Sequence, residues 1–398
     1  MKNTAWMALA AVTVGAVMTG CASATEDKQP AITNILQRDA DLLLDYGAPG
    51  ILAELDTPSG PVAVRSGFGD VAAGTPVPWD AKFRIGSFTK PFVSATLLTL
   101  VGEGRLSLDD TVDRWLPGVV KGNGNDGRKV TVRHLLQHTS GIPEYVQGLT
   151  YLFTRDTFEK QRLATVTPQQ AVALAMTFKP DFAPGTRWNY SNTNYVLAGM
   201  IIESVTGTTW QQAVIDRVLV PLDLRDTYLP DTSADIPTPH AVGYERFSGP
   251  GATREDPKYG EPIDATTLNP SWGGAAGEII STTDDSNKFL RALVRGEVMP
   301  PAQLAEMQKT VPTSPEFQSN WPGAQYGLGL VFIPNSCGGS WAHGGDIQGF
   351  MTRNGVTPDG SRSVIVTINT DSPQRKTGLA APTRDITTDL IDHALCHS

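Results

Sequence analysis

The sequence predicts a mixed fold, α/β plus all-α: an antiparallel sheet flanked by helices, with a helical domain inserted between the two halves of the sheet. Strand-like runs that alternate apolar and polar residues stand near both ends of the chain. Helical runs separated by Pro- and Gly-rich loops fill its middle. We therefore expect a signal segment at 1–24, an α/β domain built from 25–108 and 277–398, and an inserted helical domain at 109–276.

The first half of the expected α/β domain begins with a helix. Its apolar positions recur with helical spacing, at Ile32, Ile35, Leu36, Leu42, Leu43 and Leu44. Two short strands follow, "GILAELD" and "PVAVRSGFGDV". A third run, "KFRIG", leads into an apolar helix, "PFVSATLLTLV", which Gly102 and Gly104 end.

The middle of the chain reads as helices and the end as strands. The helical runs are "VTVRHLLQHTSGI", "TPQQAVALAMTF", "NTNYVLAGMIIESVTG", "TWQQAVIDRVLVPL" and "TTDDSNKFLRALVRG". The late strands are "YGLGLVFIP", "SWAHGG", "FMTRNGVT" and "RSVIVTIN", with "PDGS" as the turn between the last two. A final helix, "PTRDITTDLIDHAL", completes the domain, and a cleft between the two domains is the expected site.

Composition limits the classes of function. The chain has 398 residues, of which 40% are hydrophobic and 18% are charged, as in an ordinary globular protein of about two domains. Its net charge of −9 gives it no electrostatic reason to bind nucleic acid. No internal repeat or block of like charges suggests a repeat protein or an interaction tail.

The N-terminus is typical of a targeting segment. Lys2 precedes the uncharged run Ala5–Val17, which is too short to span a bilayer with margin. The residues 22–24, "ASA", fit a cleavage site for plain secretion, whereas "MTGC" resembles a lipobox in which Cys21 is lipidated and Met18 replaces the usual Leu. We favour the lipid anchor as the protein's contact with a membrane, and expect export in either case.

The cysteines agree with export. Cys21 either carries lipid or leaves with the signal segment, so Cys337 and Cys396 remain as a pair in an oxidising compartment. We expect a disulfide between them, and the alternative is two unpaired buried thiols.

One stretch, "FRIGSFTKPF", joins a strand to the apolar helix and contains an S-x-x-K pair. A helix that begins at Ser87 places Lys90 on the same face one turn later, where apolar neighbours lower the pKa of a lysine and make it a usable base. The helix N-terminus also offers free N–H groups to a developing oxyanion. A lone S-x-x-K is weak evidence, however, because a helix-capping serine beside a surface lysine gives the same pattern.

Two further stretches favour the catalytic interpretation. "WNYSNTNY" contains Tyr190 and Asn192 immediately before an amphipathic helix, and "WAHGGDIQGF" places His343, Gly344 and Gly345 on a predicted strand. Glycines on a strand often let another backbone or a ligand approach closely. Taken singly, the first stretch would be a helix cap and the second a bulge.

Together the three stretches resemble the penicillin-recognising serine hydrolases, a family with an S-x-x-K nucleophile. The Tyr-x-Asn and His-x-Gly motifs narrow the resemblance to secreted D-alanyl-D-alanine carboxypeptidase/transpeptidases and class C β-lactamase-like hydrolases. "GSFTK" comes early, "YSNTNY" about a hundred residues later and "HGG" near the end, as in that family. The resemblance covers roughly 31–398 and implies a β-lactamase/DD-peptidase-like fold.

The resemblance also implies roles for individual residues. Ser87 would attack a carbonyl group and form an acyl-enzyme, while Lys90 and Tyr190 would share proton transfer, with either one as the base. Asn192 would bind the amide of the substrate. His343 would hold Tyr190 or assist protonation of the leaving group.

A second group of residues would bind the substrate beside the nucleophile. The resemblance implies an oxyanion hole formed by the backbone N–H groups of Ser87 and Asp346, with Gly344 and Gly345 on the same strand. Trp272, in "SWGG", matches an aromatic wall of the cleft, and its alternative is a buried core tryptophan.

One departure from the family concerns the binding of carboxylates. Carboxypeptidase relatives carry hydroxyl residues at the positions of Gly344 and Asp346, and an arginine on the preceding strand, to bind the terminal carboxylate of D-Ala-D-Ala. Here the preceding strand, "GLGLVFIP", has no arginine. We therefore expect Asp346 to repel a carboxylate, which puts carboxypeptidase specificity in doubt.

The predicted function is a serine hydrolase of the D-alanyl-D-alanine carboxypeptidase type, acting on peptidoglycan-type D-peptides and acylated by β-lactams. The alternatives are a β-lactamase-like esterase, a D-amino-acid amidase or aminopeptidase, and a penicillin-binding sensor that does not turn over. We expect a monomer without a cofactor. His134 and His138 have metal-ligand spacing on a helix, but no acidic partner completes an H-E-x-x-H motif, so we expect structural roles for them.

Overall fold

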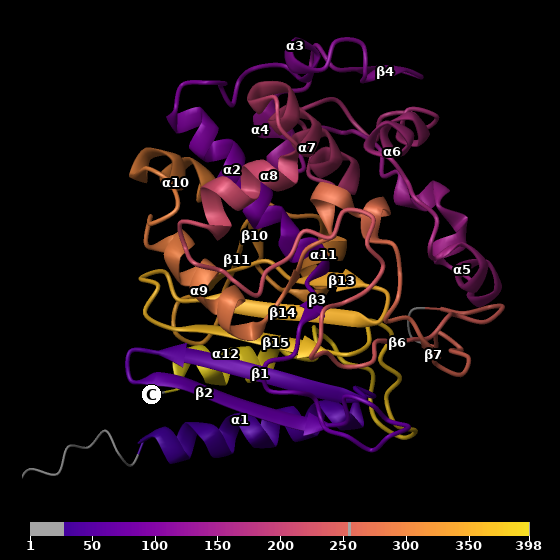
Figure 1. The fold of residues 1–398 in the computed structure, drawn as a ribbon, viewed down its shortest axis with the longest axis vertical. Coiled ribbons are helices and arrows are strands. Elements are labelled where there is room, and N and C mark those ends of the chain that lie inside the picture. The colour runs from indigo at the N-terminus through magenta and orange to yellow at the C-terminus, as the bar shows by residue number, and fades with distance from the viewer. Residues whose placement is uncertain (1–27, 254–255, 398) are drawn as a thin grey trace, which may run out of the picture.

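The sheet is antiparallel and is built from both ends of the chain (Figure 1). The computed structural model describes residues 28–253 and 256–397, so the predicted signal segment and Cys21 lie outside the described residues. The strand order is β2-β1-β15-β14-β12-β11-β10-β9, and β13 also pairs with β14. These strands are β1 (Gly50–Thr57), β2 (Gly60–Gly67), β9 (Val311–Pro312), β10 (Gln325–Tyr326), β11 (Val331–Ile333), β12 (Ser340–Ala342), β13 (Gly345–Ile347), β14 (Phe350–Val356) and β15 (Ser363–Ile368).

Helices cover both faces of this sheet, as the sequence predicts. β1 pairs with β15 in a register that sets Ile51 opposite Ile368. The alternate residues Ile51, Ala53 and Leu55 pack under α1 (Lys28–Asp45) and α12 (Thr388–Cys396), while α9 (Thr283–Val294) contacts β1 and β15 from the other face. The predicted antiparallel sheet flanked by helices is confirmed.

The helical part lies above the sheet in Figure 1. Its helices are α2 (Thr89–Gly102), α3 (Val112–Trp115), α4 (Val132–Leu136), α5 (Arg155–Gln161), α6 (Pro168–Ala175), α7 (Asn192–Thr206) and α8 (Trp210–Val214), and α10 (Pro301–Met307) and α11 (Pro315–Asn320) follow α9. Shorter turns are η1 (Gly86–Phe88), η2 (Val146–Gly148), η3 (Thr150–Leu152), η4 (Ile215–Leu219), η5 (Pro270–Trp272) and η6 (Gly274–Ala276). Two-residue strands pair as β3 (Phe83–Arg84) with β8 (Ile280–Ser281), β4 (Lys121–Gly122) with β5 (Asn125–Asp126), and β6 (Tyr244–Glu245) with β7 (Ile263–Asp264).

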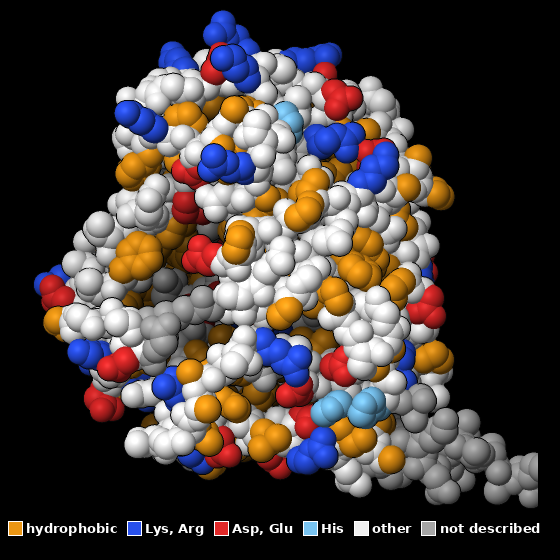
Figure 2. Space-filling view, turned by 180° about the vertical axis from the view of Figure 1, so that it is seen from behind, with side chains coloured by type: hydrophobic (Ala, Val, Ile, Leu, Met, Phe, Trp, Pro, Cys, Tyr) orange, Lys and Arg blue, Asp and Glu red, His pale blue; other side chains and the backbone are white. Residues whose placement is uncertain are grey.

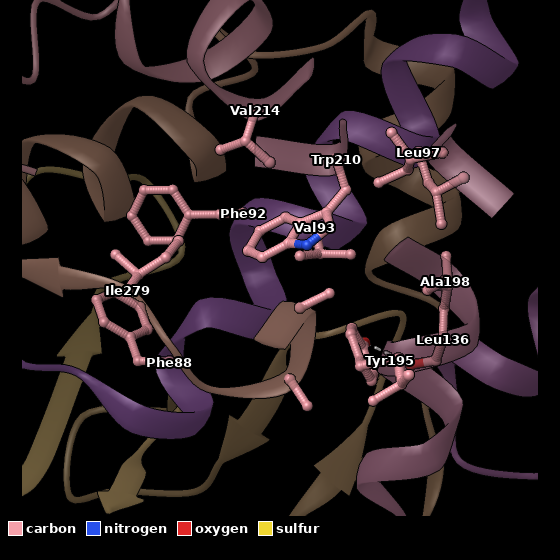
Figure 3. Packing of buried hydrophobic residues seen from close by; sticks show 14 of the residues in the cluster. Phe88, Phe92, Val93, Leu97, Leu136, Tyr195, Ala198, Trp210, Val214 and Ile279 are labelled. Carbon is pink, nitrogen blue, oxygen red and sulfur yellow. Dashed lines mark hydrogen bonds between the residues drawn. The ribbon is translucent and has the colours of Figure 1, made fainter. Parts of the chain in front are cut away.

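Helix α2 is the centre of the main hydrophobic core. Figure 3 shows its side chains Phe92, Val93 and Leu97 packed among residues of other elements, including Tyr195 of α7 and Trp210 of α8. Because apolar residues surround α2 on all sides, its first turn cannot shift without disturbing the core. Lys90 lies in that turn and Ser87 lies in η1 just before it, so the core holds the predicted nucleophile and base in place.

The strand predicted at "SWAHGG" is interrupted. β12 ends at Ala342 and β13 begins at Gly345. Between them, the backbone of His343 bonds to the side chain of Asn354 and not to the backbone of the neighbouring strand. The Asn354 Oδ1 accepts from the His343 N–H at 2.9 Å, and its Nδ2 donates to the His343 carbonyl at 2.8 Å. A Cβ on Gly345 would lie 1.9 Å from the Ile85 carbonyl oxygen, so this glycine permits the close approach of two backbones.

A disulfide joins the loop between β11 and β12 to the end of α12. Cys337 and Cys396 are bridged, with a Cα–Cα distance of 5.5 Å. Among the described residues, no helix has both the length and the hydropathy needed to cross a bilayer.

The disulfide is expected to stabilise the fold. Cys337→Ser/Cys396→Ser should lower the free energy of unfolding by up to about 4 kcal/mol, because the bridge closes a sequence separation of 59 residues and so reduces the entropy of the unfolded chain. Urea unfolding with and without reductant measures the effect, and reductant should leave the double variant unchanged. An unfolding midpoint of the native protein that does not respond to reductant would contradict this prediction.

Candidate active site

Ser87 and Lys90 lie at the joint between β3 and α2, but Ser87 does not begin the α-helix as expected. It belongs to the 3-10 turn η1, and α2 starts two residues later, at Thr89. The left-handed conformation of Gly86, with φ of 51°, allows the tight turn that η1 makes. Three residues still bring the two side chains together, with Lys90 Nζ 2.9 Å from Ser87 Oγ.

Lys90 is completely buried and has three hydrogen-bond partners. Besides Ser87 Oγ, its Nζ contacts Asn192 Oδ1 at 2.8 Å and the Ala276 carbonyl oxygen at 2.8 Å. Burial lowers the pKa of Lys90 to about 7, against the opposite effect of the carboxylates of Glu144 and Asp346. Lys90 is therefore neutral in a large fraction of molecules near neutral pH.

The three partners orient the lone pair of neutral Lys90. The Ala276 carbonyl can only accept a hydrogen bond, and so can Asn192 Oδ1, so these two oxygens take the two N–H groups of the amine. When Lys90 is protonated, its third N–H group donates to Ser87 Oγ. In the neutral amine this position holds the lone pair, which can accept the proton of the serine hydroxyl. This is the geometry of a general base beside its nucleophile.

Asn192, which we expected to bind the substrate amide, is hydrogen-bonded to other residues of the protein. Its Oδ1 accepts from Lys90, and its Nδ2 donates to Glu144 Oε2 at 3.0 Å. The same Oε2 accepts the Asn192 backbone N–H at 2.6 Å, and Oε1 accepts the Val146 N–H at 2.9 Å. Sequence analysis missed Glu144, although it closely follows the recognised "HTSGI" stretch.

Tyr190 lies against the same pair. The Lys90 Nζ is 4.8 Å from the centre of the Tyr190 ring, and the Ser87 hydroxyl is within hydrogen-bonding range of its phenol. Burial raises the pKa of Tyr190 well above its usual value of 10, so this side chain stays protonated at neutral pH. Tyr190 is thus a proton donor in the free protein, whereas Lys90 can accept a proton.

His343 has partners other than the predicted Tyr190. Its Nε2 lies 2.9 Å from Tyr326 Oη and its Nδ1 lies 2.7 Å from the Gly344 carbonyl, so both ring nitrogens are occupied. The ring centres of His343 and Tyr190 are 6.4 Å apart. Burial lowers the pKa of His343 to about 3, which makes it neutral. Sequence reasoning missed Tyr326 because it stands on β10, 17 residues before His343.

The two histidines with metal-ligand spacing have separate structural roles. His134 completes a capping box at the start of α4, where its Nδ1 accepts the Thr131 N–H at 3.2 Å. His138 is buried and its ring centre lies 4.3 Å from that of Tyr190. No group of three or more His, Cys, Asp or Glu residues in the described ranges is placed to hold a metal ion.

The backbones of Ser87 and Asp346 come close together, as an oxyanion hole requires. A Cβ on Gly86 would lie 2.8 Å from the Asp346 nitrogen, and one on Gly345 would lie 2.8 Å from the Ser87 nitrogen. These glycines let η1 and β13 pack directly against each other, so the backbones that carry the two N–H groups lie side by side.

The side chain of Asp346 forms an ion pair with an arginine, although the preceding strand carries none. Arg353 of β14 donates from Nη1 to Asp346 Oδ1 at 2.8 Å and from Nε to Asp385 Oδ2 at 2.7 Å. This arginine lies on β14, which follows β13 in the sequence and pairs with it, and not on the strand that precedes β13.

A cleft of about 790 Å³ opens beside these residues. Ser87, Tyr190, His343, Gly344 and Asp346 line one end of it. The aromatic side chains of Trp188, Phe317 and Trp321 line its wall. Figure 2 shows the molecular surface hollowed on the side opposite to the view of Figure 1, with acidic side chains near the rim of the hollow.

Trp272, which the sequence suggested as a wall of this cleft, is not among its lining residues. It is partly buried against the main core, and its carbonyl oxygen accepts a hydrogen bond from the Tyr145 hydroxyl. Its position agrees with the alternative of a core tryptophan.

Several known proteins are similar to this chain in fold and in sequence. The model of the Beta-lactamase family matches residues 26–388. A D-stereospecific amidohydrolase from Streptomyces sp. is 40% identical, with a TM-score of 0.81 over 92% of this chain and 99% of that one. The D-amino acid amidase from Ochrobactrum anthropi SV3 is 26% identical, with a TM-score of 0.76 over 92% of this chain and 97% of that one.

The chain is also similar to penicillin-binding protein 4* of Bacillus subtilis, with 28% identity over 298 residues. That match covers 72% of this chain and 60% of the relative's length. The family model spans most of the chain, and the fold agrees with it. The chain therefore belongs to the Beta-lactamase family, as a serine hydrolase of the group that includes the penicillin-binding proteins.

Proposed function

We propose that the protein hydrolyses amide bonds of D-amino acid derivatives that carry a free amino group, such as D-amino acid amides and short D-peptides, through an acyl-enzyme on Ser87. This proposal prefers the amidase alternative to the carboxypeptidase expected from the resemblance. The observation that carries it is the carboxylate of Glu144, which lies within the network of Lys90 and Asn192.

Glu144 is suited to bind a substrate ammonium group. A carboxylate has about four acceptor positions, and three donors from the protein occupy three of them in Glu144. One acceptor position remains, on a side chain that is largely buried and whose pKa is raised by burial. Glu144 is not among the residues that line the cleft, so the ammonium group would have to reach beyond that lining to bind it. Since Lys90 is neutral when it acts as a base, a bound ammonium group would be the charge partner of Glu144 during the reaction.

Two relatives support this substrate class. The Streptomyces protein is described as a D-stereospecific amidohydrolase, and the Ochrobactrum enzyme is a D-amino acid amidase that was crystallised with L-phenylalanine amide and with D-phenylalanine. Both match nearly their whole length to this chain.

The chemistry follows from the placement of the groups. Ser87 Oγ attacks the carbonyl carbon as its proton passes to Lys90 Nζ, and the oxyanion forms between the N–H groups of Ser87 and Asp346. The Tyr190 phenol donates a proton to the departing amine and regains one from Lys90. Water then attacks the ester by the reverse sequence, which releases the acid and restores Ser87.

The test compares substrates with and without a free amino group. Glu144→Gln should lower kcat/KM for D-phenylalanine amide by about tenfold to a hundredfold, since a hydrogen bond between charged groups is lost. The same change should affect N-acetyl-D-phenylalanine amide much less. Steady-state kinetics measure both, with Glu159→Gln as a matched control on the exposed face of α5.

Two outcomes would contradict this assignment. An equal loss for both substrates would mean that Glu144 positions Asn192 and Lys90 without binding the amino group. Turnover of N-acylated peptides ending in D-Ala-D-Ala, with none of D-amino acid amides, would favour the carboxypeptidase alternative instead.

We also propose that the protein is exported and reaches its substrates outside the cytoplasm. The apolar N-terminal run and the pairing of Cys337 with Cys396 support this, because disulfides persist in oxidising compartments.

A further inference from the structure

We propose that Arg353 is a carboxylate receptor in the active-site cleft, and that the side chain of Asp346 occupies it as a built-in competitor. As a result, the enzyme would reject substrates that present a free carboxylate beside Ser87. This inference rests on the proposed function and specifies which amides the site accepts.

The two carboxylates that bind Arg353 are not equivalent. The Asp385 side chain is 8% exposed, and its Oδ1 also accepts the Thr387 N–H at 3.0 Å and the Thr387 hydroxyl at 2.6 Å. The Asp346 side chain is 51% exposed and lines the cleft. Asp385 is therefore the permanent partner of the arginine, and Asp346 is the partner that a ligand could replace.

The guanidinium group reaches the cleft because the neighbouring strand leaves room for it. A Cβ on Gly344 would lie 3.3 Å from Arg353 Cδ and Nη1, tighter than ordinary contact. Arg353 Cζ also lies 5.5 Å from the ring centre of Trp321, which lines the cleft. The planar fork of arginine matches a carboxylate in two-point geometry.

The charges explain why the native site repels an anion. One arginine lies between two carboxylates, so the cluster of Asp346, Arg353 and Asp385 carries a net charge of −1. The charge of Asp346 also acts on Lys90 and Tyr190, which places it next to the reacting groups. Removal of this one charge would leave a neutral cluster whose arginine faces the cleft.

The experiment uses two dipeptides that differ in one group, D-Phe-D-Ala and D-Phe-D-Ala amide. In Asp346→Asn, which keeps the backbone N–H and the shape of the side chain, the ratio of kcat/KM for the acid to that for the amide should rise about tenfold or more. Asp109→Asn is the charge-matched control, since Asp109 is 82% exposed and lies beyond the far end of α2. It should leave the ratio at its native value.

The role of Arg353 is tested in the background of Asp346→Asn. Adding Arg353→Gln should return the acid-to-amide ratio to its native value or below. Arg353→Gln leaves Asp385 buried without its partner. The triple variant Asp346→Asn/Arg353→Gln/Asp385→Asn is therefore a second version, in which no buried carboxylate lacks a partner. Circular dichroism melting and titration of Ser87 with a reactive ester check that each variant is folded.

The outcomes are distinct. A ratio that stays high without Arg353 would mean that Asp346 acts by repulsion alone and would overturn the receptor. A ratio that does not change in Asp346→Asn would overturn the inference as well. If the native protein hydrolyses D-phenylalanine amide but neither dipeptide, competition of D-alanine and D-alanine amide against acylation by the ester measures the same preference. If it hydrolyses none of the three substrates, the proposed function fails, and the same competition still tests the receptor.

Discussion

Ser87→Ala is expected to abolish formation of the acyl-enzyme and to lower amide hydrolysis by on the order of 10⁴-fold or more. Ser87 Oγ lies 2.9 Å from Lys90 Nζ, and the proposed oxyanion hole uses the backbone N–H groups of Ser87 and Asp346. An alanine leaves the oxyanion hole and the base in place but removes the atom that forms the covalent bond.

Intact-protein mass spectrometry measures this directly. The native protein treated with a reactive ester or with benzylpenicillin should show one adduct, and Ser87→Ala should show none. Ser94→Ala is the matched control, because Ser94 lies on the same helix, is buried and bonds to Tyr195 at 2.9 Å, away from the cleft. An adduct of unchanged yield in Ser87→Ala would show that another residue is the nucleophile.

The pH dependence of the reaction is expected to report Lys90. Only the neutral amine can accept the proton of Ser87, and burial brings the pKa of Lys90 down to about 7. The neutral fraction therefore increases from about one tenth at pH 6 to about nine tenths at pH 8. For a substrate without a free amino group, such as a reactive ester, kcat/KM should rise over this interval and then level off, since Tyr190 remains protonated at higher pH.

Substitution separates Lys90 from the alternative base. Lys90→Met should lower kcat/KM by about 10²- to 10⁴-fold, the usual contribution of a general base, and should remove the rise near pH 7. Tyr190→Phe should lower kcat, because the leaving amine loses its donor, but should keep the rise near pH 7. A rise that persists in Lys90→Met and disappears in Tyr190→Phe would assign the base to Tyr190 instead.

Much of the fold could be predicted because it follows from local patterns. The alternation in "GILAELD" and the apolar run "RSVIVTIN" predicted two strands, which the structure pairs as β1 and β15 although they lie near opposite ends of the chain. The break between β12 and β13 was not predictable in the same way, because it depends on the side chain of Asn354, which replaces backbone hydrogen bonds 11 residues away.

The sequence by itself predicted the nucleophile and its neighbour from three motifs taken together. Ser87 and Lys90 are only three residues apart, and the 3-10 turn that leads into α2 brings their side chains together. The apolar residues of the same helix also indicated that burial would lower the pKa of Lys90, which is the direction found in the structure.

Only the tertiary structure decided which charges surround that pair. Glu144 bonds to Asn192, which is 48 residues away in the sequence. Arg353 bonds to Asp385, which is 32 residues away, and lies on β14, not on the strand that carries the carboxylate-binding arginine in carboxypeptidase relatives. Electrostatic energy depends on distance in space and on burial, and neither follows from separation along the chain. For this reason the sequence predicted only that Asp346 would repel a carboxylate, and the fold supplied Arg353 as its partner.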